Sequence, residues 1–457
     1  MGLMITISGL RGIVGQDLTA AIAAEYGASF GTFLRQASSR GDRRPAVCVG
    51  RDSRPSGQMV QSAVTAGLCS AGVDVVDLGI VTTPSVGIMA RHLACDGGVV
   101  ITASHNPLPY NGVKLLNAQG MAPPEHEAAE IRRVFLDRRW VCVDSVGCGR
   151  VTCDTQTDAV HVDRVLGLVD REAISAKGFK VVLDSVNGAG ARPGKRLLAA
   201  LGCSVEAVHD SPTGLFAHEP EPTEANLRGL CQDVRRAGAD IGFAQDPDAD
   251  RLAIVDGQGT YLGEEYTLAL AAQGVLSETQ GPVAANLSTS RMIDDIAART
   301  GCRVIRTPVG EAHVASAMIE NRCVIGGEGN GGVIDLRVGP IRDSLVAMAL
   351  VLQLMARTGR TVRQLADRIG AYRMIKEKFP ADPAQAAEIL DQARKRFAHA
   401  RVDTRDGARF DFEDGWLHLR ASNTEPIMRV IVETRDEAGA RRYLDQVGQI
   451  RRQVVAG

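Results

Sequence analysis

The chain has 457 residues, of which 45% are hydrophobic and 23% are charged, so it holds enough apolar material for several buried cores. Its 52 Lys and Arg residues nearly balance its 54 Asp and Glu residues, and the formal net charge is -2. No overall positive field is therefore available to hold nucleic acid or an anionic membrane, and we expect neither partner.

The ten cysteines include no Cys-x-x-Cys pair, which argues against a disulfide-built secreted domain and against a structural zinc site of that spacing. The N-terminus lacks a basic region before its apolar residues. The longest apolar run, Leu345 to Leu352, falls far short of the roughly 20 residues that a membrane helix needs. We expect a cytoplasmic protein.

Short apolar runs alternate with longer segments of helical periodicity through most of the chain. Each of these runs reads as a strand that leads into a polar or glycine-bearing loop: 46–50, 98–102, 181–184, 241–244 and 283–287. The alternation predicts repeated βαβ units with mostly parallel sheets, and therefore an α/β fold.

Three breaks divide this pattern. A predicted helix over 123–140 gives way to a polar segment, a Gly-Gln-Gly turn follows the strand 252–256, and beyond Gly370 the strands are expected to be antiparallel. We predict three α/β domains and a smaller C-terminal α+β domain, over residues 1–155, 156–257, 258–369 and 370–457.

The first candidate site is the run Thr102-Ala-Ser104-His105-Asn106-Pro107, directly after an apolar strand, with Lys114 ten residues beyond the serine. Ligand sites of α/β proteins lie at the carboxyl ends of the strands, which is where this run stands. Adjacent side chains point in different directions, so we do not expect Ser104 and His105 to form a nucleophile–base pair. A helix N-cap is the alternative interpretation.

The second is the run Asp246-Pro-Asp248-Ala-Asp250-Arg251, whose alternation places three carboxylates on one side of the segment. They would repel one another unless a cation lay among them, and oxygen ligands of this number suit Mg²⁺. A phosphorylated Ser104 could complete the shell, with Arg251 facing the same phosphate. A solvated acidic turn is the alternative.

Two further loops carry polar groups that suit a sugar phosphate. Glu328 and Asn330 stand among glycines and could hold hydroxyl groups, although a flexible connector is an alternative. Arg420 and Arg429 flank a turn rich in hydroxyl and amide groups, which could cradle a phosphate dianion or be an ordinary surface turn.

Taken together, the four loops resemble the α-D-phosphohexomutase family, and the resemblance runs from Ser8-Gly-Leu-Arg11-Gly12 to Arg429. It implies three related α/β/α domains with mixed sheets and a smaller phosphate-binding domain, arranged around a central cleft. It also implies a monomer or homodimer that acts on hexose phosphates.

The resemblance implies a role for each loop. Ser104 would carry the phosphoryl group and bind Mg²⁺ together with Asp246, Asp248 and Asp250. The other catalytic residues would be Arg11, His105, Lys114 and Arg251, with Lys114 assisting proton transfer. The substrate would be held by Glu328, Asn330, Arg420, Ser422, Asn423, Thr424 and Arg429.

The implied reaction interconverts hexose 1-phosphate and hexose 6-phosphate. The phosphoserine phosphorylates the free hydroxyl of the monophosphate, the resulting hexose 1,6-bisphosphate turns end for end, and its original phosphate returns to Ser104. A phosphatase that uses the same serine and a non-catalytic sugar-phosphate sensor are the alternative hypotheses.

The sugar loop departs from many relatives, which carry Glu-x-Ser-Gly-His where this chain has Glu328-Gly-Asn330-Gly-Gly332. Glu311 likewise stands where some relatives have a second histidine. His313 lies two positions after that place, so we do not assign it the role of that histidine. The sugar loop is similar to those of members assigned to glucosamine or mannose phosphate, and the turn at Ser422 to those of phosphomannomutases. We therefore favour glucosamine or mannose phosphate and keep a phosphoglucomutase as the alternative.

Overall fold

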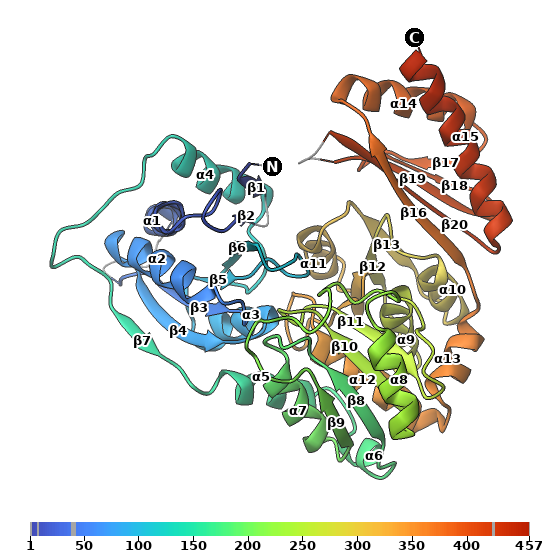
Figure 1. Ribbon diagram of the computed structural model, residues 1–457, viewed down its shortest axis with the longest axis horizontal. Helices are drawn as coiled ribbons and strands as arrows, with labels where there is room; N and C mark the ends of the chain where they lie inside the picture. The colour runs from blue at the N-terminus through green and yellow to red at the C-terminus, as the bar shows by residue number, and fades with distance from the viewer. Residues whose placement is uncertain (1, 7–8, 38–42, 423–425, 457) are drawn as a thin grey trace.

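The computed structural model describes residues 2–6, 9–37, 43–422 and 426–456. Within these residues the strands form four sheets, of seven, four, four and five strands, which follow one another along the chain. Figure 1 shows the first sheet in blue on the left, the second in green at the bottom, and the fourth in orange and red at the upper right. The predicted fold class is confirmed.

The first sheet is mixed. β3 pairs in parallel with β4 and β5, whereas β6 runs antiparallel to β5. All five residues of β5 are buried, because a central strand covered by helices on both faces must be apolar throughout. The strand order is β1 (Met4–Thr6), β2 (Gly9–Ile13), β6 (Tyr110–Asn117), β5 (Gly97–Ile101), β3 (Ala46–Arg51), β4 (Asp74–Ile80) and β7 (Val151–Cys153). The helices of this part are α1 (Ala20–Ala37), α2 (Gly57–Ser70), α3 (Thr83–His92) and α4 (Glu125–Leu136).

The second and third sheets share one plan, in which parallel strands end in an antiparallel hairpin at one edge. The second sheet has the order β11 (Leu252–Asp256), β10 (Ile241–Gln245), β8 (Lys180–Asp184) and β9 (Ser204–Val208). The third has the order β13 (Val304–Thr307), β12 (Val283–Asn286), β14 (Ile325–Glu328) and β15 (Gly332–Ile334). This shared plan agrees with the related α/β/α domains that the resemblance implies.

The helices of these two parts are α5 (Thr157–Leu166), α6 (Arg171–Ser175), α7 (Ala191–Ala200), α8 (Arg228–Ala237), α9 (Glu265–Leu276), α10 (Met292–Arg299), α11 (Glu311–Glu320), α12 (Ser344–Thr358) and α13 (Val362–Ile369). Most of them contribute to one continuous hydrophobic core, whereas α8 and α11 each pack in a smaller, separate cluster. α12 is buried from Ser344 to Ala356. No single described helix is long and apolar enough to cross a membrane; α12 and α13 meet that criterion only as a pair bent by 92°.

The fourth sheet is entirely antiparallel, in the order β16 (Arg373–Pro380), β20 (Ile427–Thr434), β19 (Gly415–Ala421), β18 (Ala408–Asp411) and β17 (Arg401–Asp403). α14 (Pro383–Arg396) and α15 (Glu437–Ala456) accompany it. Phe397 packs against Phe410, Phe412 and Tyr443 at ring-centroid distances of 5.3, 5.5 and 6.3 Å, so this part has its own aromatic core.

Candidate active site

The serine loop follows β5 and turns directly into β6, so the alternative reading as a helix N-cap is wrong. Ser104 has a left-handed backbone, with φ 50°, and its Oγ donates to Asp246 Oδ2 at 3.1 Å. The same Oγ lies 3.3 Å from His105 Nδ1. The expectation that these two side chains point apart is therefore wrong.

A buried arginine that the sequence analysis missed holds this loop in place. Arg54 is 1% exposed and pairs with Asp52 at 3.0 Å. Its guanidinium donates to the carbonyl oxygens of Ser104 and Asn106, both at 2.6 Å, and of Pro107 and Tyr110, both at 3.0 Å. A guanidinium offers five donors in a fixed plane, so one side chain can fix the loop that carries the candidate nucleophile.

The three aspartates lie between β10 and β11 and are fully buried, so a solvated acidic turn is excluded. One ligand oxygen from each lies within 4.8 Å of the others. Burial, and then repulsion from Asp248 and Asp250, raise the pKa of Asp246 well above its usual range. Oδ1 of Asp248 and Oδ1 of Asp250 have no hydrogen-bond partner among the described residues. The cluster fits a hard divalent cation, which would neutralise it and satisfy these oxygens.

Lys114 and Arg251 border this cluster. Lys114 Nζ donates to Asp248 Oδ2 at 2.7 Å and to Asp250 Oδ2 at 3.3 Å. Burial alone would lower the pKa of Lys114, but the two aspartates outweigh it and raise that pKa. Arg251 Nε lies 3.8 Å from Asp250 Oδ1 and makes no hydrogen bond within the described chain. A positively charged donor is thus available to an incoming anion.

Arg11 and His105 complete this end of the site. Arg11 Nη1 donates to Asn106 Oδ1 at 2.9 Å, which ties the start of the chain to the serine loop. Burial lowers the pKa of Arg11. Burial, followed by repulsion from Arg251 and Arg11, lowers the pKa of His105 to about 2. The imidazole is therefore neutral at ordinary pH.

A cavity of about 280 Å³ connects the predicted loops. Its lining includes His105 of the serine loop, Arg251 of the aspartate loop, Glu328 and Asn330 of the sugar loop, and the exposed Arg429. Arg420 also lines it and is oriented by a 2.8 Å hydrogen bond from its Nε to Asp406 Oδ1. Residues of all four predicted loops therefore border one space.

The structure leaves part of the predicted phosphate cradle untested. Ser422 does not line this cavity but an adjoining one of about 730 Å³, which Arg420 and Arg429 also line. Asn423 and Thr424 lie outside the described residues. Of the predicted cradle, Arg420 and Arg429 are thus the two residues that line both cavities.

The sequence analysis also missed Arg342, which binds three acidic groups of the site. Its Nη2 donates to Asp250 Oδ2 at 2.7 Å, its Nη1 to Glu328 Oε2 at 2.7 Å, and its Nε to Glu311 Oε2 at 2.8 Å. A Cβ at Gly332 would lie 2.1 Å from Cδ of Arg342. Arg342 thus fills the space next to Gly332, where many relatives carry histidine. It also pairs with Glu311, which stands where some relatives have a second histidine.

The sugar loop is held rigidly, so the alternative of a flexible connector is wrong. Glu328 is 4% exposed, ends β14, and accepts from Asn286 Nδ2 at 2.8 Å. A Cβ at Gly329 would lie 1.9 Å from Glu265 Oε2, an atom that accepts the Ser290 N–H at 2.9 Å. A side chain at 329 would therefore displace the Glu265 carboxylate, and the loop rests on Glu265, another residue missed from the sequence.

Comparison with known proteins agrees with this geometry. The chain matches the alpha/beta/alpha domains I, II and III of phosphoglucomutase/phosphomannomutase over residues 4–140, 159–259 and 263–372. It matches the C-terminal domain over residues 372–449.

Similar whole proteins are found by sequence and by structure. The chain is 39% identical to a phosphoglucomutase/phosphomannomutase of Thermococcus kodakarensis, with 97% of each chain covered. It is 36% identical to a probable phosphoglucosamine mutase of Methanopyrus kandleri, with 100% of this chain and 99% of the relative covered. A solved phosphoglucomutase/phosphomannomutase family protein of Burkholderia thailandensis has a TM-score of 0.85 at 27% identity, with 99% of each chain covered. Together with the serine, aspartate and arginine groups around one cavity, these matches show that the chain belongs to the α-D-phosphohexomutase family.

Proposed function

We propose that the protein is a hexose-phosphate mutase, which interconverts hexose 1-phosphate and hexose 6-phosphate through phosphorylated Ser104 and a hexose 1,6-bisphosphate. One observation carries the proposal: Ser104 Oγ lies 3.1 Å from Asp246, and the neighbours of these two loops, His105 and Arg251, line the same cavity as Arg420 and Arg429. The proposed reaction requires that one group transfer a phosphoryl group to or from the sugar while another holds the phosphate that is not reacting.

The metal of the proposed site is Mg²⁺, held by Asp246, Asp248, Asp250 and an oxygen on Ser104. Three carboxylates and a phosphate oxygen are the hard ligands that this ion accepts, and their own repulsion favours a cation. When bound, Mg²⁺ would supply charge neutralisation for the transferring phosphoryl group. Lys114, now paired with Asp248, would be released by that ion toward the substrate.

The remaining steps fall to side chains of this protein. Arg251 would donate to the phosphoryl oxygens, and Arg11, with His105, would keep the serine loop and the reacting group aligned. Lys114 would assist proton transfer to or from the sugar hydroxyl, because it lies beside the same aspartates as Ser104. Those aspartates raise its pKa, and a cation bound among them would weaken that effect, so that the amine could release and regain a proton. Phosphoryl transfer depends chiefly on such alignment and charge compensation.

The sugar loop and the two arginines would bind the substrate. Glu328 is oriented by Arg342 and would accept hydrogen bonds from the sugar hydroxyls, and the buried Oδ1 of Asn330 has no partner among the described residues. Arg420 and Arg429, with the turn at 422–424, would hold the phosphate that is not reacting. The same anchor would serve both orientations of the bisphosphate.

The proposal keeps the finer expectations of the sequence analysis. We propose domain limits near residues 155, 257 and 369, a cytoplasmic location, and a monomer or homodimer. For the hexose we propose glucosamine or mannose phosphate, since relatives at 36% and 39% identity carry names of both kinds.

The test is a side-by-side assay of glucosamine, mannose and glucose 1-phosphates with Mg²⁺ and a trace of the matching 1,6-bisphosphate. We expect one of the first two to give its 6-phosphate with the largest kcat/KM. Preference for glucose 1-phosphate would make the protein a phosphoglucomutase, and sustained release of inorganic phosphate in excess of isomer would make it a phosphatase. No 6-phosphate from any of them, with Ser104 phosphorylated, would refute the mutase.

A further inference from the structure

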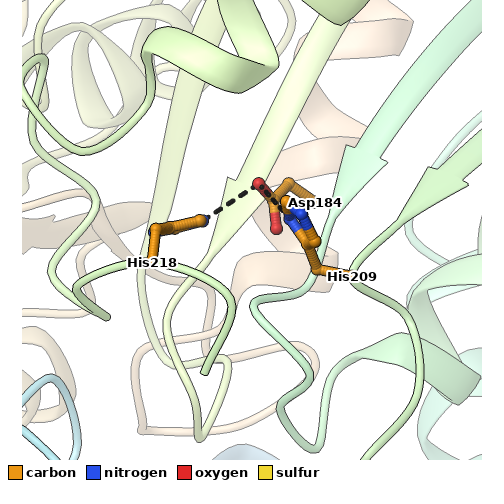
Figure 2. A group of neighbouring side chains, drawn as sticks. All are labelled: Asp184, His209 and His218. Carbon is orange, nitrogen blue, oxygen red and sulfur yellow. Dashed lines mark hydrogen bonds and ion pairs between the residues drawn. The ribbon is translucent and has the colours of Figure 1, made fainter. Parts of the chain in front are cut away.

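A second group of metal-binding side chains lies outside the cavity, at the edge of the second sheet. Asp184 ends β8 and His209 follows β9, its parallel neighbour. His218 reaches the same carboxylate from the loop that leads toward α8. Figure 2 shows the Asp184 carboxylate with both imidazoles directed at it.

The donor atoms are spaced as in a tetrahedral metal site. Asp184 Oδ2 lies 3.2 Å from His209 Nδ1 and 3.1 Å from His218 Nε2, and all three ligand atoms lie within 4.8 Å of one another. Tetrahedral zinc with bonds of about 2.0–2.2 Å has ligand–ligand edges of roughly 3.3 Å. Small side-chain rotations would therefore admit an ion.

Hydrogen bonds around the group orient these ligands. His218 Nδ1 lies 2.8 Å from the carbonyl oxygen of Glu219, which can only accept, so Nδ1 carries a proton. Nε2 faces Asp184 Oδ2, so the contact is favourable either with a second proton on the imidazole, which the raised pKa of His218 supports, or with a metal ion that takes the place of that proton. Asp184 Oδ1 accepts the Val186 N–H at 2.9 Å and leaves Oδ2 for that cation.

The site is also accessible. The Asp184 side chain is 2% exposed, whereas those of His218 and His209 are 19% and 37% exposed. An ion could enter from solvent and keep water as a fourth ligand. Two imidazoles and one carboxylate suit Zn²⁺ or a similar borderline transition ion, in contrast to the oxygen ligands of the aspartate cluster.

We propose that Asp184, His209 and His218 form a second metal site, for Zn²⁺ or a divalent ion of the same class. Binding forms one bond each from the ion to Oδ2, Nδ1 and Nε2, and any protons on those nitrogens pass to solvent. The inference does not depend on the proposed mutase activity.

The ion would fasten a loop that reaches the serine end of the active site. Between the two histidines, Gly214 packs so tightly on Ser53 that a Cβ there would lie 2.1 Å from the Ser53 carbonyl oxygen. The guanidinium of Arg54 lies over the Phe216 ring, 4.9 Å from its centroid, and Arg54 holds the Ser104 carbonyl. A structural metal at this edge would thus stabilise the clamp on the serine loop.

The test is metal binding to the full chain after chelation, with excess Mg²⁺ to saturate the aspartate cluster. We expect Co²⁺ to give the visible d–d absorption of a tetrahedral site and Zn²⁺ to displace it. In equilibrium dialysis, His209→Asn should weaken Zn²⁺ binding by more than the roughly 10- to 100-fold loss typical of outer-shell changes.

Three further variants separate the possible causes. His126→Asn removes an exposed histidine on α4 and should bind Zn²⁺ as the unmodified chain does, and Asp246→Asn should keep the Co²⁺ spectrum. His218→Gln, with circular dichroism to verify folding, should lose that spectrum. Absent d–d bands in the unmodified chain, or equal Zn²⁺ binding by His209→Asn, would show that the three residues form only an ion pair.

Discussion

At the scale of single residues, the site depends on one arginine shared among three carboxylates. Arg342 connects Asp250 of the aspartate cluster with Glu328 of the sugar loop and with Glu311. Its stem occupies the space that a side chain at Gly332 would need. Many relatives carry a histidine at the position of Gly332, and some carry one at the position of Glu311. Arg342 links these two departures, because its stem fills the space next to Gly332 and its guanidinium pairs with Glu311.

We expect Arg342→Met to destabilise the protein by about 3–5 kcal/mol, because it leaves buried carboxylates without a partner. Arg342→Lys should keep the charge but lose the planar fork, and so retain stability better than activity. Thermal unfolding and kcat/KM measure the two effects. Arg441→Met, which breaks an exposed pair with Glu437, is the control and should change both little. Equal effects of Arg342→Met and Arg441→Met would refute the role of Arg342.

Glu265 gives a prediction for pH. Burial raises its pKa to about 8 from an ordinary value of 4.5, against the opposing charge of Lys376 and with Glu264 and Glu433 nearby. Between these values the folded protein holds a proton that the unfolded chain has lost, so stability should fall as the pH rises from about 4.5 to 8, by on the order of 1 kcal/mol per pH unit. Glu265→Gln should flatten this part of a melting-temperature profile, whereas the exposed Glu320→Gln should not. A profile unchanged by Glu265→Gln would contradict the assignment.

The residues that sequence reasoning found and missed differ in a physical way. Ser104, Lys114 and the three aspartates stand in short loops at the ends of apolar strands, where position along the chain already indicates a ligand site. Arg54, Glu265 and Arg342 carry no local pattern. Their partners lie far away along the chain, such as Asp250, 92 positions before Arg342, and only folding shows that they meet.

At the scale of elements, the strands were the most predictable part of the fold. The runs at 241–244 and 252–256 correspond to β10 and β11, because buried strands are continuously apolar. The predicted helix over 123–140 is shorter, Glu125–Leu136, since Pro124 precedes it and Asp137 caps its end. Which strands pair, and in what order, follows from the packing of whole units and could not be read from the runs.

The contact between the third and fourth sheets depends on a few side chains. Arg291, next to α10, donates through Nη2 to the carbonyl oxygens of Phe412 and Gly415 at 2.8 and 2.9 Å. Ser288 Oγ lies 2.9 Å from His418 Nδ1 across the same contact. In the proposed reaction the bisphosphate turns over between two transfers, so we expect this contact to open and close during each cycle.

Weakening the contact between the third and fourth sheets should favour an arrangement in which these two parts lie farther apart. Arg291→Met should increase the radius of gyration in small-angle X-ray scattering and raise KM for the hexose phosphate more than it lowers kcat, because the anchoring arginines then spend less time over the cavity. Arg299→Met removes a hydrogen bond to the Arg368 carbonyl and leaves the fourth sheet untouched, so it should change neither. A radius and KM unaffected by Arg291→Met would show that this arginine does not hold the fourth sheet.

At the scale of the whole molecule, buried polar contacts join the units around the cavity. Ser85 of α3 lies 2.8 Å from His161 Nδ1, and His161 Nε2 lies 2.6 Å from Asp343, which caps α12. The order resembles a nucleophile triad, but all three residues are at most 2% exposed and cannot meet a substrate. They link helices α3, α5 and α12, which come from three different parts of the chain.

The central claim is that Ser104 carries the exchanged phosphoryl group. Its most direct test is to incubate the protein with Mg²⁺ and a hexose 1,6-bisphosphate, then locate the added phosphate by peptide mass spectrometry before and after adding hexose monophosphate. We predict phosphate on Ser104 that is transferred to the monophosphate, and none on Ser104→Ala. Turnover of hexose phosphates with Ser104 never phosphorylated, or with full activity of Ser104→Ala, would contradict the claim.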